Sequence, residues 1–442
     1  MSKLKFQDNL FFQMIKNDFK GNLLLLLFVL VLITIPLNNF INNSFLVLFF
    51  VCSFYFFKKI DLFIAKEQVL VVLLYFVMLL SYTWTVDKDL TLKALPKEIP
   101  LLLIPVCFLF IYKSFTRNQS KIIKYYSYSI ILLTFIFFLK AIFNYFISND
   151  INVFLYHNLV SKELNAIHFS VFVSISLFYF LTKDSKKSLD YSITIYLFLF
   201  LLLLSSKIMI FTTVILIAVY FFFFSKSANK MRLRNLIILA AAIFTFLYFG
   251  KIKEKVQFEF NIKSESNIGH TVINKKEIGS NIISMKEAWY NEKFNQTDYF
   301  SGTSFRVYQT RLFFEFLKEE SIFWTGFGLN ASYKKIEEKG IYYNVFQGTN
   351  EIDGYQKKNF HNQYIQVFAE LGVVGFLLLL LILGLNLKNA FKNKDFVHIA
   401  FAILMISLFL TESFLWRQRG VVFFTAFYCL FNTIHLSEKE KK

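Results

Sequence analysis

The sequence is divided into long apolar blocks that are almost free of charged residues, such as 22–37, 69–84 and 206–224. A run of roughly 20 apolar residues can cross the hydrocarbon core of a bilayer as a helix. The chain also has 60 Phe among its 442 residues and only 18% charged residues, against about 25% in soluble domains. The sequence therefore predicts an all-α integral membrane protein and excludes a water-soluble globule.

Twelve such blocks, each bounded by charged residues, predict about 12 transmembrane helices. The first block is expected to stay in the protein as a span, because no small-residue cleavage site of a signal peptide follows it. The expected spans are 22–37, 44–57, 69–84, 99–115, 125–147, 166–181, 191–204, 207–224, 235–249, 363–386, 398–416 and 420–436.

Charged residues between the blocks predict how the chain is oriented. Alternate connections hold 24 Lys and Arg residues on one side of the membrane, and the short loops on the other side, without residues 250–360, hold 7. Because basic residues gather on the cytoplasmic side, both termini are expected inside. Residues 250–360, between spans 9 and 10, are then expected to form a large extracytoplasmic (periplasmic) loop domain. Spans 1–9 would occupy residues 1–249, and spans 10–12 would occupy residues 361–442.

Charge and cysteine placement exclude several kinds of site. The net charge is +18, but residues 250–360 carry 16 basic and 14 acidic residues, so most of the excess lies in the cytoplasmic connections. No nucleic-acid partner is therefore predicted. Cys52, Cys107 and Cys429 each lie inside an apolar block, which supports neither a disulfide framework nor a Cys-based metal site. There is no Gly-rich phosphate loop, so no nucleotide cofactor is expected.

The expected loop domain contains one clear helical pattern, in Ser304–Glu320. Its spacing predicts an amphipathic helix that lies along the membrane and is capped by Thr303 or Ser304. Gly326 and Gly328 follow the helix. Its apolar positions are Phe305, Leu312, Phe313, Phe316 and Leu317.

A second pattern follows at the start of the tenth expected span. His361 and Asn362 are followed by nine residues and then by Gly372 and Gly375. This pattern resembles the signature of the O-antigen ligase and O-antigen polymerase family. The upstream stretch 304–328 is similar to the extracytoplasmic domain of that family, and twelve spans with a large loop between the ninth and tenth match its topology.

The resemblance implies a glycosyltransferase on the outer face of the bacterial cytoplasmic (inner) membrane. The donor would be a glycan on undecaprenyl diphosphate, and the acceptor would be a hydroxyl of lipid A-core or of another glycan. Such enzymes are expected to work without a metal or a cofactor and to invert the anomeric carbon. A polymerase of the same family remains an alternative to a ligase.

The outer arginines are candidates for binding the donor, because a diphosphate leaving group needs fixed cations. Only seven of the 48 basic residues are Arg, and four of these lie on the expected outer side. The planar guanidinium suits phosphate better than an ammonium does. We expect Arg306 to be catalytic and Arg311, Arg417 and Arg419 to bind substrate. The alternatives are contacts with lipid phosphate and interfacial snorkelling.

His361 is the expected general base, because a neutral imidazole can take a proton from an acceptor hydroxyl near pH 7. The alternative is a histidine that caps the following helix, next to the supporting residue Asn362. Lys207 stands where the family more often has Arg, and we expect it to be a second diphosphate ligand. His168 is a weaker candidate for the substrate cavity, and ordinary interfacial placement is an alternative.

Three further supporting roles follow from position alone. Lys140 lies within an apolar span and is a candidate substrate ligand that could also snorkel outward. Glu412 could orient Arg417 or Arg419. Gly372 and Gly375 are expected to be packing glycines that permit close approach of helices.

A transporter or flippase with twelve spans is the competing class. Transporters favour short external loops, detectable repeat halves and broken central helices. This chain instead places residues 250–360 in one external segment. The sequence therefore favours the glycosyltransferase over the transporter, whereas it barely separates ligase from polymerase.

Overall fold

The computed structural model describes residues 18–19, 22–55, 65–161, 163–225, 281–350 and 352–433. Within these residues almost all regular structure is helical, and two strands of two residues each form the only sheet. The protein is therefore all-α, as predicted. The expected ninth span, 235–249, and residues 250–280 of the expected loop domain lie outside the described residues.

Helices occupy the apolar blocks of the N-terminal half, and their bounds fall within a few residues of the predicted spans except at α5 and α6. In chain order the elements are α2 (Leu23–Thr34), α3 (Asn39–Tyr55), α4 (Lys66–Leu80), η1 (Ser81–Thr83), α5 (Lys88–Glu98), α6 (Pro100–Ser148), η2 (Ile151–Phe154), η3 (Tyr156–Asn158), α7 (Ala166–Thr182), α8 (Ser188–Leu203), α9 (Lys207–Val219) and the π-helical turn η4 (Tyr220–Phe224).

The C-terminal half begins with a small domain and ends with three helices. Its elements are β1 (Ile282–Ile283), α12 (Met285–Tyr290), β2 (Tyr299–Phe300), α13 (Gly302–Glu319), α14 (Ser332–Tyr342), η6 (Tyr355–Lys357), α15 (Gln363–Asn393), α16 (Phe396–Phe409), η7 (Phe414–Trp416) and α17 (Gln418–Asn432).

Four of the described helical segments are long and apolar enough to cross a bilayer by length and composition. They are Lys66–Thr83, Arg117–Ser148, Lys207–Phe224 and Gln363–Asn393. Five shorter apolar helices, α2, α3, α7, α8 and α16, accompany them. The chain is thus an all-α membrane protein, while the number of twelve spans stays a prediction.

Helix α6 differs from the prediction. The fourth and fifth expected spans, 99–115 and 125–147, are parts of one helix of 49 residues. The charged stretch between them was expected to be a cytoplasmic connection. It contains no Gly or Pro, so nothing in its residues interrupts a helix, and charge alone does not end one.

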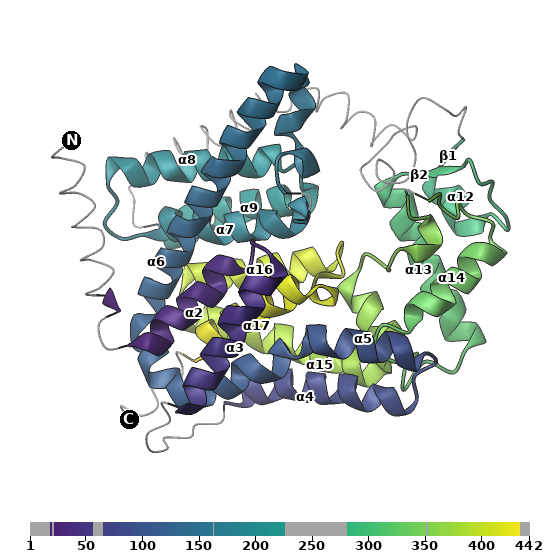
Figure 1. Ribbon diagram of the computed structural model, residues 1–442, viewed down its shortest axis with the longest axis horizontal. Helices are drawn as coiled ribbons and strands as arrows, with labels where there is room; N and C mark the ends of the chain where they lie inside the picture. The colour runs from purple at the N-terminus through teal and green to yellow at the C-terminus, as the bar shows by residue number, and fades with distance from the viewer. Residues whose placement is uncertain are drawn as a thin grey trace.

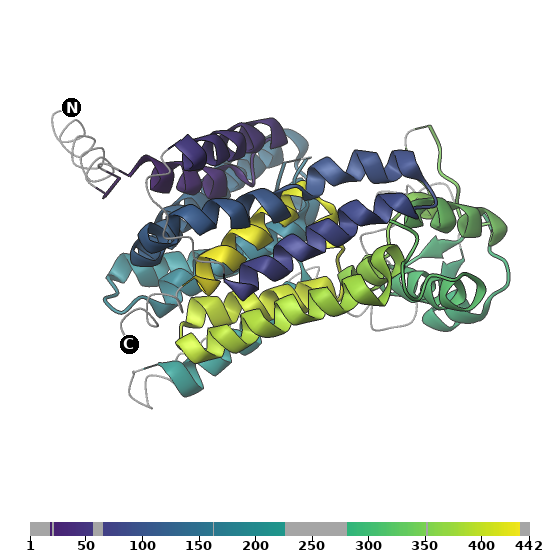
Figure 2. The same cartoon turned by 90° about the horizontal axis from the view of Figure 1, so that it is seen from below.

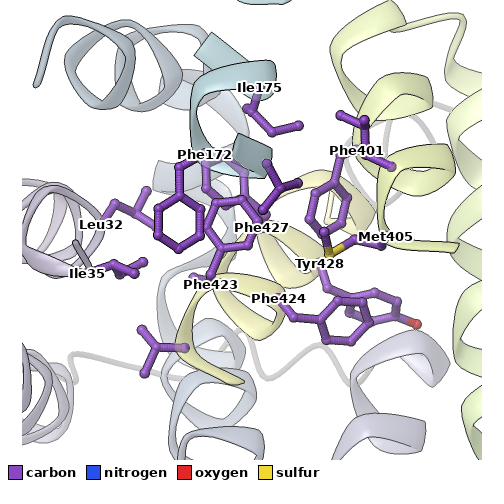
Figure 3. Close-up of a cluster of buried hydrophobic side chains, with 14 of the residues drawn as sticks. Leu32, Ile35, Phe172, Ile175, Phe401, Met405, Phe423, Phe424, Phe427 and Tyr428 are labelled. Carbon is purple, nitrogen blue, oxygen red and sulfur yellow. The ribbon is translucent and has the colours of Figure 1, made fainter. Parts of the chain in front are cut away.

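Helix α17 forms the centre of the core. All of its residues from Gly420 to Asn432 are buried. Figure 3 shows Phe423 and Phe427 among side chains of α2, α7 and α16. The ring centroids of Phe423 and Phe172 are 4.5 Å apart, and those of Phe427 and Phe401 are 5.8 Å apart. The phenylalanine-rich sequence thus supplies a core of interlocking rings.

The elements α12, α13 and α14, with β1 and β2, gather at one end of the molecule (Figures 1 and 2). The helix α13 confirms the predicted helical pattern, but its cap is Ser301, whose side chain accepts a bond from Ser304 N. Its apolar face packs inside the protein, where Phe305, Leu312 and Phe316 are buried in a core that belongs to this small domain. That the helix lies along the membrane stays a prediction.

Helix α15 connects the small domain to the helical bundle and lies beside α4 (Figure 2). Asn362 caps it by accepting bonds from Tyr364 N and Ile365 N. The helix is broken at Gly372, whose φ of 65° lies in the left-handed region. A Cβ at Gly372 would stand 2.2 Å from Trp324 O. The close approach predicted at this glycine is therefore made by a loop of the small domain and not by another helix.

Candidate active site

A cavity of about 850 Å³ lies where the small domain meets the helical bundle. Five separate segments of the chain line it, around residues 156–167, 205–211, 302–306, 358–361 and 411–417. The cavity brings together five residues that the sequence singled out. These are Lys207, Arg306, His361, Glu412 and Arg417.

Three residues in the cavity wall have left-handed backbone conformations that non-glycine residues rarely adopt. They are Tyr156 with φ of 53°, Ser205 with φ of 54° and His361 with φ of 47°. Each precedes or begins a turn into a helix: η3, α9 and α15 respectively. Such strain persists only where surrounding contacts hold it, and it gathers at functional sites. The backbone therefore singles out this cavity independently of its charges.

Glu412 lies between two of the expected catalytic residues. Its Oε1 is 3.2 Å from Nη2 of Arg306, and its Oε2 is 3.7 Å from Nδ1 of His361. Burial opposes ionisation of Glu412, but the nearby His361 and the charge of Arg306 lower its pKa to about 2. Glu412 is therefore an anion at neutral pH, and it contacts Arg306 and His361 instead of the Arg417 or Arg419 expected from the sequence.

The guanidinium of Arg306 is largely occupied by contacts within the protein. Its Nε and Nη2 donate to Thr411 O at 3.1 and 2.9 Å, and Nη1 donates to Gly302 O at 3.0 Å. With the bond to Glu412, these contacts use most of its five N–H donors. Arg306 therefore tethers the connection between α16 and α17, a role the sequence did not predict.

Two other cations in the cavity are available to a ligand. Arg417 is exposed and Lys358 is half-buried, and within the part of the chain that the structure describes neither makes an ion pair. Burial and the charge of Arg417 lower the pKa of Lys358, although Asp353 acts in the opposite direction. An anion bound beside Lys358 and Arg417 would relieve this electrostatic cost.

The N-terminus of α9 supplies a further site for an anion. Lys207 is its first residue, and Ser206 precedes it without forming a side-chain cap. The Ser206 hydroxyl is buried and has no partner among the described residues. Uncapped N–H groups and the positive end of the helix dipole favour negative charge at this place. Lys207 therefore lies where a phosphate would be stabilised by backbone and side chain together.

Three expected arginine and lysine ligands lie outside the cavity lining. Arg311 is inside the small domain, where its Nε donates to Glu315 Oε1 at 2.8 Å. Arg419 pairs with Glu163, with Nη2 and Oε2 3.3 Å apart. Lys140 donates to a backbone carbonyl, with its Nζ 3.4 Å from Val160 O.

The supporting residues also have defined places. Asn362 caps α15, so the alternative of a capping role for His361 is not needed. His168 is buried in α7 with its ring 4.6 Å from that of Phe414, and it does not line the cavity. A Cβ at Gly375 would stand 2.4 Å from the Leu371 side chain, so this glycine serves packing within α15 itself.

A family model described as O-antigen ligase matches residues 192–380. This part of the chain, less than half of its 442 residues, is similar to the O-antigen ligase family. No curated protein matches the chain. The O-antigen ligase domain contains Lys207, Arg306 and His361, and the enzymes of its family are glycosyltransferase-like ligases and polymerases of lipid-linked glycans.

Sequence reasoning missed several residues that line this cavity. His157 and Tyr156 come from the connection between α6 and α7, and Lys358 comes from the end of the small domain. Burial lowers the pKa of His157 to about 4, although Glu412 acts in the opposite direction. The signal in the sequence was the polar stretch 149–165 between two apolar blocks. That His157 lies near Glu412 could not be read from the sequence.

Proposed function

We propose that this chain is a membrane glycosyltransferase of the ligase type. It would transfer a glycan from undecaprenyl diphosphate to a hydroxyl of lipid A-core on the periplasmic face of the bacterial inner membrane. The family match supports the reaction class. The observation that carries the proposal is that one cavity holds His361 beside ionised Glu412 and, in the same space, the cations Arg417 and Lys358, which form no ion pair among the described residues.

The donor diphosphate fits the basic part of the cavity. Arg417 offers a planar fork for two phosphate oxygens, and Lys358 adds a point charge in a partly buried place. Lys207 and the N-terminus of α9 form the other side. Arg306 acts by holding Glu412 and Thr411, and its remaining donor capacity faces the same space. The developing charge of the leaving group would thus meet cations that are already in place.

The acceptor hydroxyl would be activated by His361. With Nδ1 facing the Glu412 carboxylate, the imidazole carries its proton on Nδ1 and leaves Nε2 free to accept one. The distance of 3.7 Å is longer than a hydrogen bond, and such contacts often tighten when substrate binds. The acceptor oxygen then forms its bond to the anomeric carbon as the bond from that carbon to the diphosphate oxygen breaks. The proton passes to His361, and attack opposite the leaving group inverts the carbon.

The size of the cavity limits what it holds. About 850 Å³ matches the usual volume of a small-ligand site and is far less than a long glycan occupies. We infer that the diphosphate and the sugars next to it lie inside, and that the rest of the glycan extends outward. The cavity thus selects the linkage to be broken more than the identity of the whole polymer.

The test is transfer by the purified full-length protein in detergent or nanodiscs. The donor is an undecaprenyl diphosphate-linked glycan and the acceptor is lipid A-core, without added metal and in the presence of EDTA. Formation of lipid A-core-linked glycan is expected. Abolition of transfer by EDTA would contradict metal-independent catalysis.

A polymerase would give a different product. It would extend the lipid-linked glycan itself and leave lipid A-core unmodified. Glycan profiles of a deletion strain separate the same two activities in cells. Loss of lipid A-linked polymer with persisting lipid-linked long chains indicates a ligase, whereas loss of long chains indicates a polymerase.

A further inference from the structure

A second, much smaller cavity lies beneath the small domain, beside the first turns of α15. Its volume is about 20 Å³, which is room for a single water-sized particle. Helix α5, the loop before α14, α15 and η7 all contribute to its wall. The charged residues that line it are Lys97, Glu98 and Glu370.

Both carboxylates of this cavity are buried, and one of them is not satisfied. Glu370 is 4% exposed and accepts bonds from Ser332 Oγ at 3.0 Å and from Gln366 Nε2. Glu98 is 3% exposed, and its Oε2 has no partner among the described residues. Burial and the negative charge of Glu370 raise the pKa of Glu98 well above its usual range. The protein itself therefore does not compensate this oxygen, which faces the cavity.

The backbone around the cavity also favours a positive charge. Glu98 is the last residue of α5, and Glu370 lies two residues before the break at Gly372. The first segment of α15 thus ends here, and a helix C-terminus carries partial negative charge, although the carbonyls of Ala369 and Glu370 already accept from Phe327 N and Gly328 N. Membrane proteins bind small cations at the ends of broken helices in the same manner. Lys97 does not fill the cavity, since its Nζ lies over the Trp416 ring, 5.0 Å from the centroid.

The chemistry of the donor set narrows the class of ion. The polar groups around the cavity are carboxylates and amides. The amide oxygens of Asn330, Gln363 and Gln366 already accept hydrogen bonds, so the carboxylate oxygens are the donors left for an ion. No group of three or more His, Cys, Asp or Glu within the described residues is arranged to hold a metal ion. Two carboxylates in a space for one particle are too few for the six to eight ligands that Ca²⁺ takes, or for the hydrated octahedron of Mg²⁺.

We propose that this cavity binds one small monovalent cation of the size of Na⁺, between Glu98 and Glu370. The ion links α5, the loop before α14 and the first segment of α15, and so fixes the small domain on the bundle. This site is separate from the cavity of the proposed transfer reaction, and the inference does not depend on that reaction.

The experiment measures binding of radiolabelled Na⁺ to the purified full-length protein in detergent, by scintillation proximity, with choline chloride keeping the ionic strength constant. Saturable binding, displaced by unlabelled NaCl and not by choline chloride, is expected. Glu98→Gln keeps the shape of the side chain and should lose this binding. Asp89→Asn is the matched control, because Asp89 is exposed on the same helix, and it should bind as the wild type does.

A second measurement keeps the test decisive if Glu98→Gln does not fold. NaCl should raise the melting temperature of the wild-type protein by about 3 °C relative to choline chloride, with saturation. Absence of both Na⁺ binding and this shift in the wild type would overturn the proposal and leave a buried proton or water in the cavity. Equal binding by a folded Glu98→Gln variant would overturn it as well.

Discussion

The two cavities near the start of α15 differ in size and in charge. One is about 850 Å³, is open and collects Lys207, Lys358 and Arg417. The other is about 20 Å³ and has two buried carboxylates in its wall. Glu412 and Glu163, the acidic residues of the large cavity, each form an ion pair with an arginine. Glu98 in the small cavity instead has an oxygen without a partner among the described residues. The two cavities thus differ in sign, with basic residues in the wall of the large one and buried carboxylates in the wall of the small one.

A residue between the cavities joins them physically. Gln366 donates to Glu370 in the small cavity, and its Oε1 accepts from Ser413 Oγ at 3.3 Å. Ser413 directly follows Glu412 of the large cavity. If the opposite charges of the two cavities are what separates their functions, substitutions in one cavity should leave the function of the other unchanged.

The largest effect is expected at His361. His361→Ala removes the proposed base and should reduce transfer by about 10²–10⁴-fold, since this is the usual contribution of general-base catalysis. The measurement is the transfer assay with purified protein at equal protein level. Asp89→Asn, an exposed substitution on α5 outside both cavities, is the control and should keep transfer within a few-fold of wild type. Equal loss in both variants would contradict a catalytic role for His361.

Arg417 and Arg419 offer a matched pair two residues apart. Arg417 lines the large cavity without an ion pair among the described residues, whereas Arg419 pairs with Glu163. Arg417→Ala should lower kcat/KM for the lipid-linked donor by about 10–100-fold, the range expected when a charge-assisted hydrogen bond is lost. Arg419→Ala should change it by less than about threefold. A larger loss in Arg419→Ala than in Arg417→Ala would indicate that the diphosphate binds outside the cavity.

Acid should weaken the large cavity through Glu412. Its folded-state pKa of about 2 lies below the ordinary value of 4.5, so the stabilisation it provides is complete above pH 4.5 and is lost as the pH falls toward 2. The free energy of unfolding should fall by up to about 3 kcal/mol as Glu412 is protonated. Glu412→Gln lacks this titration, so its stability and that of the wild type should converge over the same pH window. Thermal unfolding of both proteins at a series of pH values measures this convergence. A stability difference between them that does not change with pH would contradict an ionised Glu412.

The smallest effect is expected at Lys207. Lys207→Arg keeps a cation at the N-terminus of α9 and adds the planar fork, so transfer should stay within about threefold of wild type or improve. Lys207→Ala should impair transfer clearly. Transfer kinetics at varied donor concentration distinguish Lys207→Arg from Lys207→Ala. Similar transfer rates for the two variants would mean that the N-terminus of α9 binds the donor without the side chain.

Much of the fold could be predicted because apolar blocks of helical length have few alternatives. The expected spans at 166–181, 191–204 and 207–224 correspond closely to α7, α8 and α9. Charge marks the side of a membrane but not the end of a helix, so α6 could not be foreseen as one helix. The spacing in α13 predicted its helix, but periodicity cannot distinguish a protein core from lipid as the medium that covers an apolar face.

The site could be predicted only in part for a similar reason. The rarity of Arg and the His361 motif identified Arg306, Arg417 and His361, which share one cavity. The family resemblance added Lys207, and position in an apolar span added Glu412. Which arginine is free and which is tied depends on partners far along the chain, since Arg306 bonds the carbonyl of Thr411, 105 residues away. No local pattern records such a contact. Lys358 and His157 were missed because each is an ordinary residue until the fold buries it.

The tether between Arg306 and Thr411 has a consequence for biogenesis. Glu412 and Arg417 follow every other residue of the large cavity in the sequence, yet they complete its charge pattern. During synthesis, the earlier helices and the small domain emerge with Arg306 and His361 still lacking their carboxylate partner. The hairpin of α16 and α17 must insert before Thr411 and Glu412 can reach Arg306. A nascent chain therefore gains the arrangement of Arg306, His361 and Glu412 only in the last steps of its assembly.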